Sequence, residues 1–275
     1  MCDLHGCGDD TKNLPLPPVA AADRRAFLAG LAALPLATVL AYPDLARAAA
    51  GTTTDITVPT PSGGTAMGAL ALPKGDGKAP AVLLIHEWWG LNDQIKAVAA
   101  ELAELGYIAL AVDLYGGKYG STPQEAKALM QGLDPKAATE QLVTLVGWLK
   151  GHERSTGKVG TMGWCFGGGW SLNASLATKV DATVIYYGRV TKSAADLASL
   201  SSPVLGHFGT LDKSINPKMV GEFEAAMAEA GKTDLTVHWY TANHAFANPT
   251  GSRYDADDAA LAWARTRTFL RKNLG

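Results

Sequence analysis

The chain has 275 residues, of which 47% are hydrophobic and 18% are charged, and its formal net charge is −2 at pH 7. This composition is typical of a globular protein with a sizeable core and excludes a disordered chain. No cluster of Lys or Arg is longer than two adjacent residues. We therefore expect no nucleic-acid-binding surface and no surface for anionic membranes.

Residues 1–48 have the pattern of an export signal. Arg24 and Arg25 precede an apolar run at residues 26–41, which is too short to span a bilayer comfortably. Ala46-Arg47-Ala48 follows, an A-x-A sequence of the kind that signal peptidase cuts. The arginine pair and the Ala-Phe-Leu after it resemble a bacterial twin-arginine signal, with Asp23 in place of the usual Ser or Thr.

Cleavage after Ala48 would leave a mature chain of residues 49–275 in the periplasm or outside the cell. The export machinery would then be a partner, and the mature protein would have no stable membrane span. The alternative is that this segment forms an amphipathic or buried N-terminal helix. Cys2 and Cys7 lie within it, so Cys165 would be the only mature cysteine, with no intramolecular disulfide. Neither the cysteines nor the histidines have metal-ligand spacing, and we expect no metal and no cofactor.

The mature part alternates apolar β-like runs with amphipathic helical patterns. This alternation predicts one α/β domain with a doubly wound, mostly parallel sheet and helices on both faces. An antiparallel pair, 55–61 with 65–72, is expected to open the domain. Further strands are expected at 81–85, 107–112, 158–162, 182–187, 203–208 and 235–240. Helices are expected at 92–105, 135–150 and 256–273, from about Phe166 onward, and from Asn216-Pro217 to Gly231.

A sharp strand-to-helix turn is predicted around Cys165. The sequence Gly163-Trp164-Cys165-Phe166-Gly167 has the G-x-nucleophile-x-G pattern of a nucleophile elbow, with sulfur where serine usually lies. Asp212 and His244 follow later in the chain. Nucleophile, acid, histidine is the chain order of an α/β-hydrolase, so we expect that fold and acyl-transfer chemistry.

Each candidate catalytic residue lies just beyond the C-terminal end of an expected strand, where parallel sheets place their sites. A cysteine attacks as the thiolate and needs a base, which His244 would supply while Asp212 fixes the tautomer of the imidazole. The backbone N–H groups of Phe166 and Trp88 are expected to form the oxyanion hole. The alternatives are ordinary structural roles: a small buried cysteine, a capping aspartate and a loop histidine.

Several motifs together resemble the dienelactone hydrolase family over residues 55–272. They are His86-Glu87-Trp88-Trp89-Gly90-Leu91-Asn92, Val112-Asp113-Leu114-Tyr115, Gly163–Gly168, Tyr186-Tyr187-Gly188, Asp212 and His244-Ala245-Phe246-Ala247. The resemblance implies a catalytic triad of Cys165, Asp212 and His244. It also implies that Glu87 accepts the thiol proton when the substrate enters. The alternative for Glu87 is a surface salt bridge.

The substrate site departs from the family pattern. The best-known members of that family hold a substrate carboxylate with arginines, where this chain has Gly116-Gly117-Lys118 and Asn248. Lys118 or Arg253 could act only as point charges without the bidentate fork of an arginine at those places. We therefore expect an ester or lactone substrate broader than a small dicarboxylate dienelactone. The expected pocket residues are Trp88, Trp89, Tyr115, Lys118, Trp164, Phe166, Tyr187 and Asn248.

Two other functions remain open from the sequence. One is a carboxymethylenebutenolidase that acts on dienelactone itself. The other, from a different class, is a redox-active thiol protein in which Cys165 is oxidised, although no resolving cysteine accompanies it. A binding module with a degenerate site would not need the complete triad. We expect the protein to be a monomer that acts on a small molecule.

Overall fold

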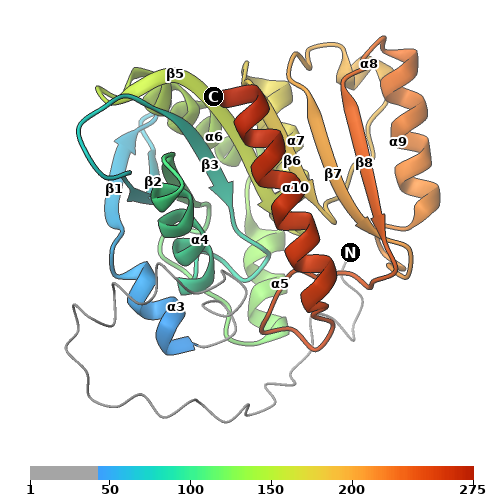
Figure 1. Ribbon diagram of the computed structural model, residues 1–275, viewed down its shortest axis with the longest axis horizontal. Helices are drawn as coiled ribbons and strands as arrows, with labels where there is room; N and C mark the ends of the chain where they lie inside the picture. The colour runs from blue at the N-terminus through green and yellow to red at the C-terminus, as the bar shows by residue number, and fades with distance from the viewer. Residues whose placement is uncertain (1–42) are drawn as a thin grey trace.

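A computed structural model describes residues 43–275. These residues form an eight-stranded sheet with the strand order β1-β2-β4-β3-β5-β6-β7-β8 (Figure 1). β1 pairs with β2 and β2 with β4 in antiparallel fashion, and all neighbours from β4 to β8 are parallel. The mostly parallel, doubly wound sheet and the antiparallel opening pair expected from the sequence are confirmed.

The strands are β1 Thr54–Pro59, β2 Thr65–Ala71, β3 Ala79–Ile85, β4 Ile108–Asp113, β5 Ser155–Trp164, β6 Ala182–Tyr186, β7 Val204–Gly209 and β8 Leu235–Tyr240. The helices are α3 Pro43–Ala50, α4 Asp93–Glu104, α5 Pro123–Gly132, α6 Pro135–Gly151, α7 Phe166–Ala177, α8 Ala194–Leu197, α9 Pro217–Glu229 and α10 Ala256–Leu274.

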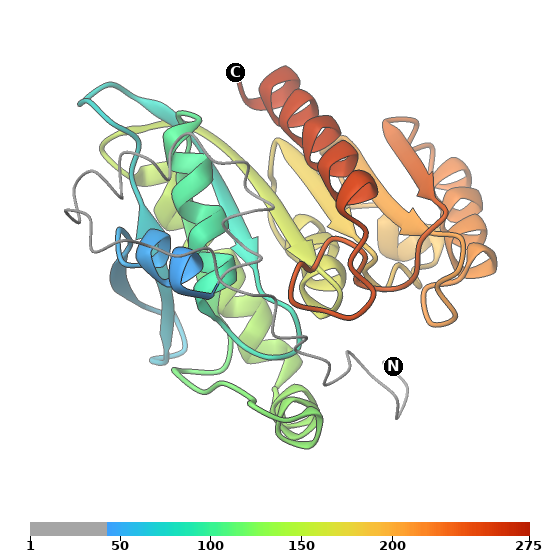
Figure 2. The same cartoon turned by 60° about the horizontal axis from the view of Figure 1, so that its bottom comes forward.

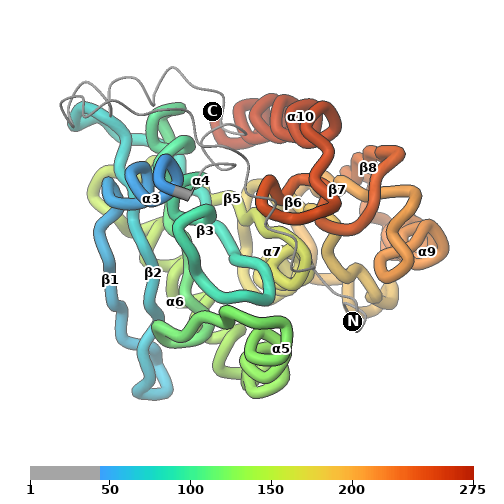
Figure 3. Tube along the Cα trace, turned by 90° about the horizontal axis from the view of Figure 1, so that it is seen from below, coloured from blue at the N-terminus to red at the C-terminus, as the bar shows by residue number. Residues whose placement is uncertain are grey.

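Helices cover both faces of the sheet. α3, α4 and α10 lie on one face, and α6 and α7 lie on the other (Figure 3). Side chains of a strand alternate between the two faces. Leu84 of β3 therefore packs with Leu102 of α4, while its neighbour Leu83 packs with Leu142 of α6. This double burial explains why the central strands are continuous apolar runs rather than alternating ones.

The parallel strands deliver their C-terminal ends to one edge of the sheet, which faces downward in Figure 1 and comes forward in Figure 2. The loops after β3, β5, β7 and β8 all begin at this edge. Functional side chains of parallel α/β sheets gather at such an edge because the loops there are free to vary while the strands hold them. It is where the candidate catalytic residues were expected.

Helix α5 was not expected from the sequence, although a signal for it is present. The Thr122 hydroxyl accepts a hydrogen bond from the Glu125 backbone, and the Glu125 carboxylate accepts one from the Thr122 backbone. Pro123 stands at the first helical position. This capping box with proline is a recognised helix start, so the helix follows from local sequence.

Helix α3 contains the expected cleavage position after Ala48. Its side chains Leu45 and Ala46 are buried and belong to the same core cluster as α4. Arg24, Arg25 and the apolar run at 26–41 lie outside the described residues. Within residues 43–275, no helix is both long and apolar enough to cross a membrane.

Candidate active site

The turn between β5 and α7 places Cys165 at its apex. β5 ends at Trp164 and α7 begins at Phe166, so Cys165 is the single residue between them, with φ 53° and ψ −115°. A positive φ is strained for a residue with a side chain. A Cβ at Gly163 would overlap the backbone of Gly167, and one at Gly167 would overlap the carbonyl of Ile85. The glycines on either side are thus required by the close approach of three backbone segments.

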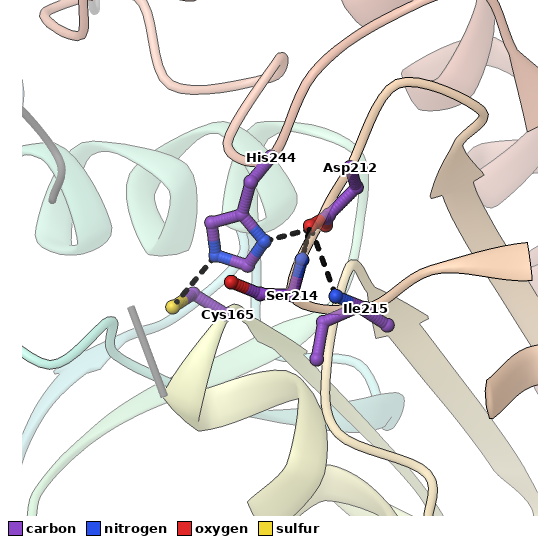
Figure 4. Close-up of polar contacts among 5 residues, drawn as sticks. All are labelled: Cys165, Asp212, Ser214, Ile215 and His244. Carbon is purple, nitrogen blue, oxygen red and sulfur yellow. Dashed lines mark hydrogen bonds and ion pairs between the residues drawn. The ribbon is translucent and has the colours of Figure 1, made fainter. Parts of the chain in front are cut away.

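The three expected catalytic residues meet in one hydrogen-bonded chain (Figure 4). His244 Nε2 lies 3.1 Å from Cys165 Sγ, and His244 Nδ1 lies 2.6 Å from Asp212 Oδ2. All three residues are buried, with exposed fractions of 7% for Cys165, 6% for His244 and 3% for Asp212. With Nδ1–H donating to the carboxylate, Nε2 is left as the acceptor that faces the thiol.

Asp212 is held by more than the imidazole. Its other oxygen, Oδ1, accepts hydrogen bonds from the N–H groups of Ser214 at 2.8 Å and Ile215 at 2.9 Å (Figure 4). Burial by itself would raise the pKa of Asp212, but the hydrogen bonds and charge of His244 and the two backbone donors outweigh it, so the pKa is lowered. Asp212 is therefore a charged, oriented partner for the imidazole.

Tyr187 supports the imidazole, a role that the sequence did not indicate. Its ring lies edge-on to His244 with 5.2 Å between centroids, and edge-on to Phe246 at 5.4 Å. The residue has φ 37° and a fully buried side chain, and its N–H donates to the His207 carbonyl. A ring fixed in this way limits the orientations that the His244 side chain can adopt.

His86 orients the peptide between Glu87 and Trp88. Its Nδ1 lies 2.5 Å from the Glu87 carbonyl oxygen, and its Nε2 lies 3.3 Å from the N–H of Leu114. The neutral tautomer with the proton on Nδ1 satisfies both contacts, because Nε2 then accepts from Leu114. In a trans peptide the C=O and the next N–H point in opposite directions. The N–H of Trp88 therefore points away from His86, on the opposite side of the peptide from the hydrogen bond to the Glu87 carbonyl.

The protonation of His86 is expected to make stability depend on pH. Burial lowers its pKa from 6.5 to about 4, so the unfolded chain binds a proton between these values that the folded protein does not. The free energy of unfolding should therefore fall as pH falls from 6.5 to 4, by about 3 kcal/mol from this residue. Urea unfolding at several pH values would measure this for the wild type and for His86→Gln, whose amide can donate and accept but does not titrate. Equal pH dependence in both proteins would contradict the assignment.

Glu87 is buried rather than on the surface, with 7% of it exposed. Its Oε2 accepts a hydrogen bond of 2.6 Å from Asn248 Nδ2. The loop after β3 and the loop after β8 therefore meet through these two side chains. Phe166, the other expected oxyanion donor, is the first residue of α7, and an N–H at this helix position has no carbonyl partner within the helix.

Comparison with known proteins places the chain in a family. The sequence profile of the dienelactone hydrolase family matches residues 67–274. The chain belongs to the dienelactone hydrolase family. A carboxymethylenebutenolidase from Pseudomonas putida is 30% identical over 221 residues, which cover 75% of this chain and 92% of the relative. Carboxymethylenebutenolidase 1 from Cupriavidus pinatubonensis is 25% identical over 219 residues, covering 76% and 92%.

A solved relative supports the fold of this dienelactone hydrolase family member. The dienelactone hydrolase-like promiscuous phosphotriesterase P91 from metagenomic libraries superposes with a TM-score of 0.73 at 26% identity. The alignment covers 82% of this chain and all of the P91 chain. The α/β-hydrolase fold expected from the sequence is confirmed, and the protein is a hydrolase.

A pocket of about 630 Å³ opens between the loop after β4 and helix α5 of this family member, and Cys165, Asp212 and His244 are not among the residues that line it. Tyr115 and Lys118 line it, together with Leu129 of α5 and Leu133 directly after the helix. Tyr115 also reaches the elbow, because its ring lies 5.8 Å from that of Phe166. Burial, followed by the nearby charge of Cys165, raises the pKa of Tyr115, so the phenol keeps its proton. The α5 side of this pocket was not expected from the sequence.

The remaining aromatic residues expected in the pocket lie at different depths. Trp164 stacks on Tyr186 at 5.5 Å in the core, and only 7% of it is exposed. Trp88 is buried, and Trp89 packs edge-on against it at 5.0 Å. Among residues 43–275, no group of three or more His, Cys, Asp or Glu side chains could hold a metal ion.

Proposed function

We propose that this protein hydrolyses a carboxylic ester or lactone by nucleophilic catalysis through a thioester intermediate. The observation that carries the proposal is the chain from Cys165 Sγ through His244 to Asp212, with contacts of 3.1 Å and 2.6 Å. A nucleophile within reach of a base that is itself oriented by a carboxylate is the arrangement that acyl transfer requires.

In the first half-reaction His244 Nε2 takes the proton of the Cys165 thiol, and Sγ forms a bond to the carbonyl carbon of the substrate. The electron pair of the C=O bond moves to oxygen, and the N–H groups of Phe166 and Trp88 stabilise this oxyanion. Asp212 stabilises the imidazolium. When the C=O bond re-forms, the C–O bond to the leaving group breaks, and His244 gives its proton to the leaving oxygen.

In the second half-reaction water replaces the leaving group. His244 takes a proton from this water, whose oxygen attacks the thioester carbon. Collapse of the second oxyanion breaks the C–S bond, the sulfur regains a proton from His244, and the carboxylic acid leaves. In a lactone the alcohol and the acid remain in one product molecule.

Glu87 enters the proposal through the family resemblance. It would accept the thiol proton on substrate entry, in place of His244. On this route Glu87 takes the place of His244 in the first half-reaction: the proton moves from the thiol to the Glu87 carboxylate and from there to the leaving oxygen as the C–O bond breaks, which leaves Glu87 ionised again. The burial of Glu87 in the loop that carries Trp88 supports a role at the site rather than in a surface ion pair.

We further propose that the substrate is an ester or lactone other than a small dicarboxylate dienelactone. Asn248 binds Glu87 through its amide, and an amide is a weaker ligand for a substrate carboxylate than a bidentate arginine. The pocket beside Tyr115 has Leu129 of α5 and Leu133 directly after it in its wall, and its charged residues are Lys118, Glu125 and Asp134. The leucines would contact an apolar arm of the substrate.

A panel of paired substrates tests this function. Purified protein should hydrolyse neutral aryl esters, alkyl esters and lactones with kcat/KM at least about tenfold above that of matched compounds that carry a carboxylate. The expected factor corresponds to the free energy of one hydrogen bond to a charged group, which a substrate carboxylate would lack here. Initial rates for each pair would be compared at one pH. A strong preference for carboxylated lactones would favour a carboxymethylenebutenolidase acting on dienelactone itself. Absence of hydrolysis from the whole panel would remove the proposed function.

We propose that the mature protein is exported, with the signal removed after Ala48, and that it is a monomer. The proposal rests on the arginine pair, the apolar run and the A-x-A sequence in residues 1–48. Mass spectrometry of the exported protein would identify its first residue, and light scattering its mass. An intact Met1, or an N-terminus upstream of α3, would contradict the cleavage position.

A further inference from the structure

The contact between Glu87 and Asn248 joins two loops that are 161 residues apart in the chain. Glu87 follows β3 directly, and Asn248 lies in the loop after β8 that also carries His244. The donor Nδ2 and the acceptor Oε2 are 2.6 Å apart, and Glu87 is buried. A short hydrogen bond to a carboxylate at a buried position is among the stronger single contacts in a protein.

The direction of the Asn248 amide is set by Thr250. The amide oxygen Oδ1 accepts from the Thr250 N–H at 3.0 Å and from its hydroxyl at 2.9 Å. The amide nitrogen must then face Glu87, because reversing the amide would place donors against donors. Gln94 of α4 donates to the Thr250 hydroxyl at 2.9 Å. A directed series of donors thus runs from Gln94 through Thr250 and Asn248 to the carboxylate of Glu87.

Asn248 is also fixed relative to the catalytic imidazole. Its N–H donates to the carbonyl of Ala245 at 3.0 Å, which closes a turn directly after His244. Ala245 has φ 63°, a conformation that a residue with a side chain adopts only when its surroundings enforce it. The backbone of this turn therefore fixes His244 and Asn248 relative to each other, while the imidazole contacts Cys165 and the amide contacts Glu87.

We propose that Asn248 is a positioning residue that holds the Glu87 carboxylate in one orientation at the active site, and that Thr250 fixes the amide for this purpose. The inference rests on the proposed function, in which Glu87 accepts a proton. An amide holds a carboxylate by hydrogen bonding but carries no charge of its own. It therefore lowers the proton affinity of Glu87 less than an arginine in the same place would. The single turn 244–248 would thus position both the imidazole that contacts the thiol and the carboxylate of Glu87.

A double-mutant cycle between Asn248 and Glu87 tests this role. Asn248→Ala should lower kcat/KM for a neutral ester about tenfold, the usual effect of losing a hydrogen bond to a charged group. In a Glu87→Gln background the same substitution should have little further effect, because the carboxylate it positions is gone. Thr250→Val removes one of the two donors to the amide oxygen and should cause a smaller loss. Additive losses from Asn248→Ala and Glu87→Gln would overturn the inference while leaving the hydrolytic function intact.

Asn248→Asp gives a readout that a purely structural role would not change. Two carboxylates in contact share one proton, which raises the pKa of the pair. The acid limb of the profile of kcat/KM against pH should then move to higher pH in Asn248→Asp and return in Asn248→Asp combined with Glu87→Gln. Thermal unfolding compares the same variants without an activity assay. The Tm of Asn248→Asp should fall as the pH rises from 5 to 8, and the Tm of the double variant should not. An unchanged acid limb would overturn the inference, whether or not Tm changes, because Tm reports on the contact alone.

Rates of the wild type and of Cys165→Ala, measured in the same series, distinguish failure of the proposed hydrolytic function from failure of the proposed role of Asn248. A wild type no faster than Cys165→Ala would remove the proposed function, whereas the Tm comparison would still report on the contact. A Glu87→Gln enzyme with full activity would overturn the role of Glu87 and with it that of Asn248, but not the triad.

Discussion

Replacement of Cys165 by alanine is expected to lower kcat/KM for an activated aryl ester by about 10⁴-fold or more, because no other group can form the acyl-enzyme. Removal of the nucleophile usually leaves only the catalysis that substrate binding and the oxyanion hole provide. Alanine has the same backbone preference as cysteine at φ 53°, so the fold should be retained. Steady-state rates together with circular dichroism would measure both.

Cys165→Ser is the matched control for this experiment. A hydroxyl keeps the hydrogen bond to His244 but ionises far less readily than a thiol. Its activity should lie between those of the wild type and Cys165→Ala. With the wild type, mass spectrometry of a quenched reaction with a slowly hydrolysed ester should detect an acyl group on the peptide containing Cys165. Undiminished turnover in Cys165→Ala would refute the thioester mechanism.

Replacement of Asp212 by asparagine is expected to lower kcat/KM by about 10³–10⁴-fold, the scale found when the carboxylate of a catalytic triad is lost. The backbone N–H groups of Ser214 and Ile215 both donate to one oxygen of Asp212. They would hold the amide oxygen of asparagine and turn its NH₂ group toward His244. Nδ1 would then have to accept, and the proton would lie on Nε2, facing the thiol, where it cannot act as a base.

The loss in Asp212→Asn should be accompanied by little change in thermal stability, since the substitution preserves shape and the two backbone contacts. Alkylation of the thiol by iodoacetamide at several pH values gives a second measurement. The thiol of Asp212→Asn should react more slowly near neutral pH, because its base has the wrong tautomer. A loss smaller than about tenfold would mean that Asp212 serves mainly as a loop cap.

Local sequence was sufficient to predict the α/β architecture and the three side chains, Cys165, Asp212 and His244, that the structure brings into contact. Strands buried on both faces of a sheet are continuous apolar runs bounded by helical patterns, so their positions in the chain and the mostly parallel sheet could be predicted from the sequence. The order of the strands in the sheet came only from the structure. The elbow was predictable because Gly163 and Gly167 reflect steric limits within five residues of Cys165. Asp212 and His244 could be assigned because each follows a strand whose end is fixed by the parallel sheet.

Helix α5 could also have been found, since Thr122, Pro123 and Glu125 form a local start signal. Its hydrophobic periodicity, the signal that identifies most helices, is weak because the helix is short and only Ala126 is buried within it.

The sequence by itself determined the strands of the sheet, the strained cysteine turn and the choice of Cys165, Asp212 and His244 as candidates for nucleophile, acid and base, because each depends on residues near one another in the chain or on strand ends. Only the tertiary structure decided that Glu87 is held by Asn248, that His86 orients the peptide before Trp88, and that Tyr187 supports His244. These contacts join separate loops, and their energies depend on distances and orientations that no spacing in the sequence encodes. The packing of the whole sheet brings the loops to one edge, and the hydrogen bonds then select one arrangement among them.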